Sequence, residues 1–103
     1  MIKYTVYQIA KSEKSDPRGF EAMIDGSLDV SFFKLAYRAV CEIEAVDLNH
    51  VFEIGNIGPD EKIRRFDFQP MHSISVGDVI YDSLLREYHV VQGLGFKRLE
   101  GVA

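Results

Sequence analysis

Three residue types of a hydrolase triad lie close together in the last third of the chain: His72, Ser73 and Asp78. A triad needs a base that accepts from the nucleophile and donates to the acid, whereas adjacent residues of an extended chain point to opposite sides. The chain also lacks a Gly-x-Ser-x-Gly nucleophile elbow. We therefore expect no catalytic residue. The segment is interpreted as a structural turn, in which polar side chains cap backbone N–H groups and Gly77 adopts a positive φ.

The polar residues of the chain suggest two other kinds of site. The N–H groups of the same turn could form a small anion-binding concavity, although the repeated Gly and following Lys of a phosphate loop are missing. A metal site would need closely spaced ligands, and none of the candidates has such spacing: His50, His72, His89 and Cys41. We expect no metal and no cofactor, and we interpret Cys41 as a small buried hydrophobic residue.

Charged residues suggest two binding surfaces. Residues 1–60 hold six Lys/Arg and ten Asp/Glu, and we expect an acidic surface there to bind a basic protein partner through Glu42, Glu44, Asp47 and Glu53. The alternative is a nucleic-acid surface of cations near Phe66, Phe68, Tyr81 and Tyr88, formed by Lys62, Arg64, Arg65, Lys97 and Arg98. The net charge of −4 works against general nucleic-acid binding. The simplest interpretation of both sets is a solvated face.

Period-two alternation of apolar residues predicts strands at 2–9, 37–44, 63–68, 79–81, 88–91 and 96–99. The last three include a hairpin, and Ile74, Val76 and Val79 are expected to point into the core. Asp47 is a good N-cap for a short helix that would end at Gly55-Asn56, followed by a loop at 57–59.

Residues 11–36 have the weakest pattern. We predict a solvated loop over 11–19, and a short strand at 20–24 that Asp25-Gly26 ends. Ser27 would then cap a helix over 28–34. The spacing of Phe32, Ala36 and Val40 also fits a helix, but strict alternation favours a strand from about Tyr37.

Together these elements predict a single α+β domain over residues 1–103: a small, mostly antiparallel sheet with one or two short helices packed on it. An exposed edge strand could pair with its copy in a homodimer. One cysteine excludes an intramolecular disulfide, and no apolar run has the length of a signal peptide or of the ~20 residues needed to span a bilayer. We expect a cytoplasmic protein that contacts no membrane.

Several blocks of the sequence resemble the YodL-like family. They are Tyr4-Thr-Val-Tyr-Gln, the segment Asp47 to Asn56, the segment His72 to Ile80, Tyr88-x-Val90 and Gly95-Phe96. The family often has Ser where this chain has Gly77. The resemblance covers most of the chain and implies a small protein of plasmids, conjugative elements or phages, without an assigned activity. The resulting hypothesis is a non-enzymatic, protein-binding accessory protein of a mobile genetic element, which modulates a host defence or DNA-transfer component.

Overall fold

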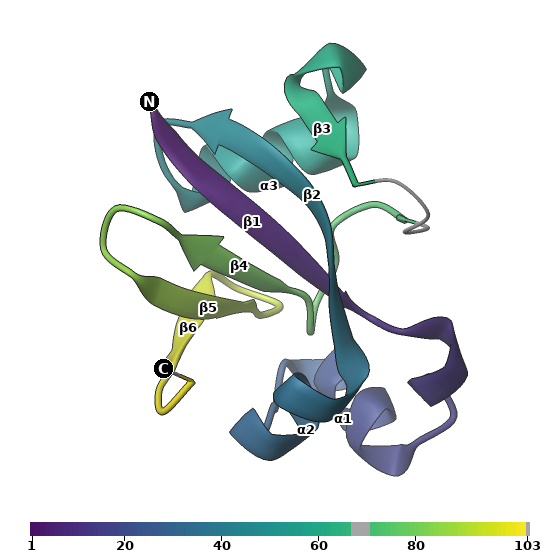
Figure 1. Ribbon diagram of the computed structural model, residues 1–103. Helices are drawn as coiled ribbons and strands as arrows, with labels where there is room; N and C mark the ends of the chain where they lie inside the picture. The colour runs from purple at the N-terminus through teal and green to yellow at the C-terminus, as the bar shows by residue number, and fades with distance from the viewer. Residues whose placement is uncertain (67–70, 103) are drawn as a thin grey trace.

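The computed structural model describes residues 1–66 and 71–102. Its sheet has six strands in the order β3-β2-β1-β4-β5-β6, and each neighbouring pair is antiparallel (Figure 1). The strands are β1 (Ile2–Ile9), β2 (Tyr37–Ala45), β3 (Ile63–Arg65), β4 (Val79–Asp82), β5 (Glu87–Val91) and β6 (Phe96–Leu99). The described helices are α1 (Pro17–Asp25), α2 (Val30–Ala36) and α3 (Leu48–Ile57), with 3-10 turns η1 (Lys11–Glu13) and η2 (Asp60–Lys62). The predicted α+β class is confirmed.

Five of the six strands predicted from alternation are confirmed to within one residue at each end, because alternation is a local signal that survives folding. The exception is the third strand, which was predicted to reach Phe68. Strand β3 ends at Arg65, and the amide of Phe66 still donates to the carbonyl of Val40 at 3.0 Å. Residues 67–70, including Phe68, lie outside the described residues.

The loop and short strand predicted at 11–24 are wrong from Pro17 onward, since these residues form α1. Asp16 caps the helix by accepting a hydrogen bond from the amide of Arg18 at 2.8 Å, and Pro17 occupies the first turn. Gly26 ends the helix in a left-handed conformation with φ 76°. These are strong helix boundaries, and they outweigh the strand preference of one phenylalanine and one isoleucine.

The second helix also begins later than predicted. Helix α2 starts after Asp29 instead of Ser27, and it continues to Ala36. The amide of Ser27 donates to the carboxylate of Asp25 at 2.9 Å, so this serine closes the turn after α1 and does not cap a helix.

Asp47 is confirmed as the N-cap of α3, where its carboxylate accepts from the amide of His50 at 2.8 Å. The predicted end at Gly55-Asn56 is wrong, because the helix continues to Ile57 and Gly58 caps it. Gly55 serves packing instead: a Cβ there would overlap the side chain of Ile74.

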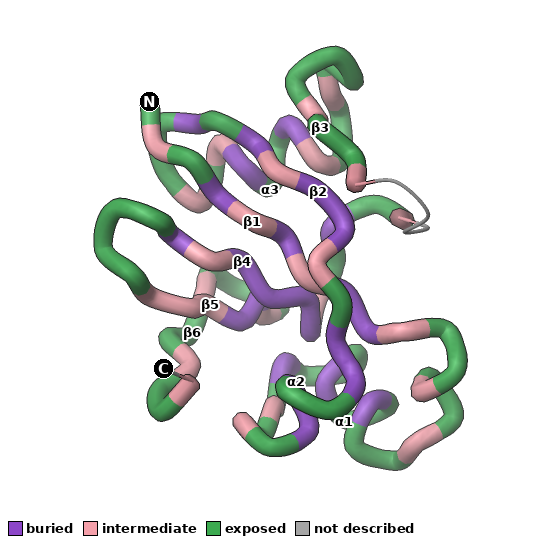
Figure 2. Tube along the Cα trace, in the orientation of Figure 1, coloured by how far each residue is buried: buried purple, intermediate pink, exposed green. Residues whose placement is uncertain are grey.

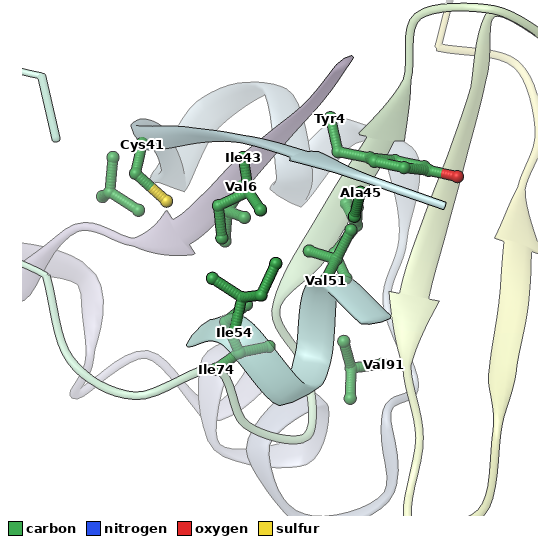
Figure 3. Close-up of a cluster of buried hydrophobic side chains, with 11 residues drawn as sticks. Tyr4, Val6, Cys41, Ile43, Ala45, Val51, Ile54, Ile74 and Val91 are labelled. Carbon is green, nitrogen blue, oxygen red and sulfur yellow. The ribbon is translucent and has the colours of Figure 1, made fainter. Parts of the chain in front are cut away.

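Two apolar clusters lie on opposite faces of the sheet. Helix α3 covers one face, behind the sheet in Figure 1, and packs on the cluster that Figure 3 shows; it includes Tyr4, Val6, Cys41, Ile43, Val51, Ile54 and Ile74. Helix α2 covers one end of the other face through a cluster that contains Ile9, Phe32, Phe33, Ala36, Tyr37, Val79 and Val90. Cys41 is fully buried and burial raises the pKa of its thiol to about 12, as expected of a buried hydrophobic residue.

Candidate functional site

The turn predicted within residues 72–78 forms at residues 75–78, where its own side chain and backbone groups close it. Asp78 accepts from the amide of Ser75 at 3.0 Å, and Gly77 has a φ of 93°. Ile74 and Val79 are buried as predicted, while Val76 is half-buried. The turn is tied to its surroundings, because the hydroxyl of Tyr37 donates to the carbonyl of Gly77 at 2.6 Å.

The three residues of the hydrolase triad do not form one. Nδ1 of His72 lies 2.7 Å from the backbone carbonyl of Ser73, not from its hydroxyl. Between His72 and Asp78 stands the buried amide of Gln8, whose Nε2 lies 2.9 Å from both the His72 carbonyl and Oδ2 of Asp78. Gln8 Oε1 accepts from the amide of His72 at 3.2 Å. Gln8 therefore fastens the 72–78 segment to β1.

Burial raises the pKa of Asp78 to about 6. Hydrogen bonds from Ser75 and Gln8 and the positive charges of His72 and Lys14 lower it, so they offset only part of the desolvation. With a pKa of about 6, this buried carboxyl ionises at a higher pH than an exposed aspartate does.

The histidines and Cys41 do not converge. In residues 1–66 and 71–102, no group of three His, Cys, Asp or Glu side chains could hold a metal ion. Nδ1 of His50 lies 3.1 Å from the amide of Val46 at the start of α3, and Nε2 of His89 lies 3.4 Å from the Glu87 carboxylate. Over the same described stretches, no helix has the length and apolar character needed to cross a membrane.

Only part of the predicted acidic and basic sets meets on one half of the sheet face opposite α3, namely Glu42, Glu44 and Arg64. Glu42 and Glu44 alternate with core residues that contact α3, so their side chains project to the other side. We call this surface the open face, since no described helix packs over it; it carries Lys3, Thr5, Glu42, Glu44, Arg64 and Tyr81 and faces the viewer in Figure 1.

Charges on the open face pair with one another across the strands. Oε1 of Glu42 lies 3.2 Å from the guanidinium of Arg64 and 4.0 Å from Nζ of Lys3. Lys3 is also the register partner of Glu44. A shallow depression of about 230 Å³ brings Lys62 beside Glu42, Glu44 and Arg64. Cations and anions are thus interleaved, and neither sign dominates the surface.

The other predicted site residues lie elsewhere. Glu53 lies on α3, on the opposite side of the sheet from Glu42, and the carboxylate of Asp47 caps the start of that helix. Arg65 pairs with Asp60 at 2.9 Å. The acidic set is therefore divided between the two faces.

The basic set is divided between the two edges of the sheet. Lys97 and Arg98 lie on β6, five strand positions from β3, which is about 24 Å at the usual strand spacing. Arg98 is also paired with Glu87 at 3.4 Å. Self-pairing of either edge strand would bring like charges together, because β3 carries Arg64 and Arg65 and β6 carries Lys97 and Arg98. The edge-strand homodimer itself stays a prediction.

Helix α1 presents a different kind of surface. Phe20, Met23 and Ile24 are 63%, 50% and 65% exposed, whereas the buried residues of the helix are Gly19 and Ala22 (Figure 2). Spacing of i, i+3 and i+4 places the three large side chains on one side of the helix. We call them the apolar face of α1. A surface helix ordinarily turns its large apolar residues inward, and α1 does the reverse.

Close backbone contacts explain why α1 packs on the rest of the protein through its small residues, Gly19 and Ala22. A Cβ at Gly77 would overlap the carbonyl of Ala22, so the turn and the helix touch backbone to backbone. A Cβ at Gly19 would overlap the end of the Ile9 side chain and come close to the carbonyl of Glu13. Small residues thus lie at the contacts of α1 with its neighbours, and none of the apolar-face residues belongs to either core cluster of the described residues.

Acidic side chains flank the apolar face of α1. Glu21 and Asp25 are exposed and four residues apart, so they lie along one side of the helix. The one cation of the helix, Arg18, is bound to Asp16 at 3.0 Å, and its guanidinium lies 4.7 Å from the centre of the Phe32 ring. The surface is therefore apolar with an acidic border.

No protein-family model matches this chain, and neither curated proteins nor solved structures yield a match. The resemblance to the YodL-like family remains a prediction that rests on the sequence blocks.

Sequence reasoning missed the apolar face of α1, although its signals are present. Asp16-Pro17 is an N-cap followed by a favoured first helical residue, and Gly26 is a favoured C-cap. A helix between them would have grouped Phe20, Met23 and Ile24. Their outward direction, however, follows from the approach of Gly77 and could not be found locally.

Proposed function

We propose that this protein is a non-enzymatic binding domain that inserts the apolar face of α1 into an apolar groove of a partner protein. One observation supports this proposal above the others: the helix is held by Gly19 and Ala22 while three large apolar side chains remain in water. Exposed apolar clusters with a polar border are typical of interaction surfaces. Residues at i, i+3 and i+4 are the usual anchors of helix-in-groove recognition.

The acidic residues beside the apolar face of α1 indicate which charge the groove of the partner protein should carry. Glu21 and Asp25 are exposed beside it, and the chain has a net charge of −4. A partner groove with basic side chains at its rim would complement this charge and accelerate association. The basic partner expected from the sequence is thus retained, but α1 replaces Glu42 and Glu44 as its docking element.

The biological setting follows from the family resemblance. We propose an accessory protein of a mobile genetic element that acts in the cytoplasm and modulates a host defence or DNA-transfer component. The buried thiol of Cys41 is compatible with a reducing compartment. The nucleic-acid alternative takes second place, since Lys62, Arg64 and Arg65 lie at one sheet edge and Lys97 and Arg98 at the other.

Site-specific crosslinking tests the proposed surface. A photoreactive phenylalanine at position 20 should trap one discrete partner in host cells, whereas the same residue at Leu84 should not trap it. Leu84 is a suitable control because it is 68% exposed but lies on the β4–β5 turn. The purified partner should then bind the wild-type protein and fail to bind the Phe20→Ser/Ile24→Ser variant. Equal trapping at both positions, or binding that survives the double substitution, would refute the proposal.

A further inference from the structure

A second hollow lies where β1 passes into η1, away from the open face. It has a volume of about 280 Å³ and is lined by Gln8, Ile9, Lys11, Lys14, Met71 and His72. This size is close to the lower limit of small-ligand pockets, about 300 Å³. Ile9 and Met71 supply apolar walls, and the remaining four residues supply polar groups. Apolar walls with a few convergent polar groups are the usual composition of a binding site.

Positive side chains converge on this hollow. Lys11 and Lys14 are three residues apart at a 3-10 turn, where residues i and i+3 lie on the same side. Glu13 stands between them in sequence but projects about 120° away. Both lysines are exposed, and neither forms an ion pair with any of the residues described. His72 also lines the hollow.

Hydrogen bonds fix the floor of the hollow before any ligand arrives. Gln8 is 2% exposed, and its amide holds the backbone of His72 and the carboxylate of Asp78. Lys14 is close enough to Asp78 for its charge to lower the pKa of that carboxyl. Lys11 and Lys14 carry two positive charges, and Asp78 carries at most one negative charge. The opening of the hollow is therefore positive, although the chain as a whole has a net charge of −4.

We infer that this hollow binds a carboxylate attached to an apolar group. Lys11 and Lys14 hold the carboxylate, and the apolar group lies against Ile9 and Met71. Two sources share this chemistry: a small free organic acid, and the C-terminal residue of a peptide with an apolar side chain. The site is separate from the apolar face of α1, so it stands whether or not α1 binds a partner.

Amide NMR titrations of the full chain test the inference with two probes, 3-phenylpropionate and the peptide N-acetyl-Gly-Leu-Phe with a free carboxyl group. Each should produce saturable shifts at Gln8, Lys14 and His72, and the corresponding neutral amide should bind at least about tenfold more weakly, as expected when a charge-assisted contact is lost. Tighter binding of the peptide would assign the site to a C-terminus, and tighter binding of phenylpropionate would assign it to a free acid.

Substitution of the lysines provides the matched comparison. The Lys11→Gln/Lys14→Gln variant should lose at least about tenfold in affinity for the better probe. Lys34→Gln, which changes an exposed lysine of α2, should bind like the wild type. The inference is overturned if neither probe gives saturable shifts at millimolar concentration, if the neutral amides bind as well, or if the double variant retains its affinity.

Discussion

The open face of the sheet and the apolar face of α1 are both in contact with solvent. Charged side chains of the open face have partners within the protein, whereas the large apolar side chains of α1 are not buried by it. On the open face, Glu42 lies between Lys3 and Arg64, so that its charge is already paired. On α1, Phe20 and Ile24 have no counterpart in the described core. Charges stand out in a sequence and apolar residues are assumed to be buried. In this protein the strand register pairs the conspicuous charges with one another. The way in which α1 packs leaves its large apolar residues exposed.

The largest effect is expected from Gly77→Ala, which tests how α1 is seated. The substitution adds a Cβ at a φ of 93° and against the Ala22 carbonyl. Backbone strain and overpacking together should lower the free energy of unfolding by about 3 kcal/mol, measured by urea denaturation. Gly95→Ala is the control, because its φ of 81° is similar but no atom lies near the new Cβ. Equal losses for the two variants would show that α1 does not rest on this turn.

The Asp78→Asn variant tests the effect on stability of a buried carboxyl, for comparison with the exposed ion pairs of the open face. Both hydrogen bonds to this carboxylate go to Oδ2, so the amide oxygen of the variant can accept both. The folded-state pKa of about 6 lies above 3.8, the ordinary value of an aspartate carboxyl in the unfolded chain. The stability that this group contributes is therefore complete below pH 3.8 and is lost as the pH rises through 6.

Relative to the wild type, the Asp78→Asn variant should gain up to about 3 kcal/mol of unfolding free energy between pH 4 and pH 8. Urea denaturation of both proteins at several pH values measures this difference. Parallel pH profiles would mean that the carboxyl is not desolvated in the folded protein.

A smaller change is expected on the open face. Glu42→Gln removes the ion pairs with Lys3 and Arg64, and it should cost about 0.5–1 kcal/mol at low salt and less at high salt. Urea denaturation at two ionic strengths measures the effect. Glu53→Gln on α3, for which no ion pair is found in the described chain, should be neutral. A salt-independent loss for Glu42→Gln would contradict the surface-pair description.

The smallest effect on stability is expected for Phe20→Ser/Ile24→Ser. Both side chains are exposed, so the free energy of unfolding should change by no more than about 0.5 kcal/mol per site. Phe32→Ala, in the core beneath α1, should instead lose about 3–5 kcal/mol. If the double variant loses as much as Phe32→Ala, the apolar face belongs to the fold and is not reserved for a partner.

Local signals account for the parts of the fold that the sequence predicts well. The alternation of 2–9 and the Asp47 cap need only neighbouring residues, and both are confirmed. The pairing of Glu42 with Arg64 joins residues 22 apart, and β4 pairs with β1 across most of the chain. These long-range contacts decide which charges are satisfied, and no local pattern specifies them.

The candidate site depends on the same long-range contacts. The capping residues of α1 predict a helix, but only the contact of Gly77 with Ala22 shows which side of it faces outward. The division of the cations likewise follows from the strand order, which puts β3 and β6 at opposite edges.

The most direct test compares the two surfaces with one purified partner, the protein trapped by the photoreactive residue at position 20. Its dissociation constant should rise at least about 100-fold for Phe20→Ser/Ile24→Ser, because buried interface anchors each contribute more than about 1 kcal/mol. For Glu42→Gln/Glu44→Gln on the open face it should change by less than about threefold. A large loss for the open-face variant with unchanged binding of the α1 variant would contradict the proposed role of α1.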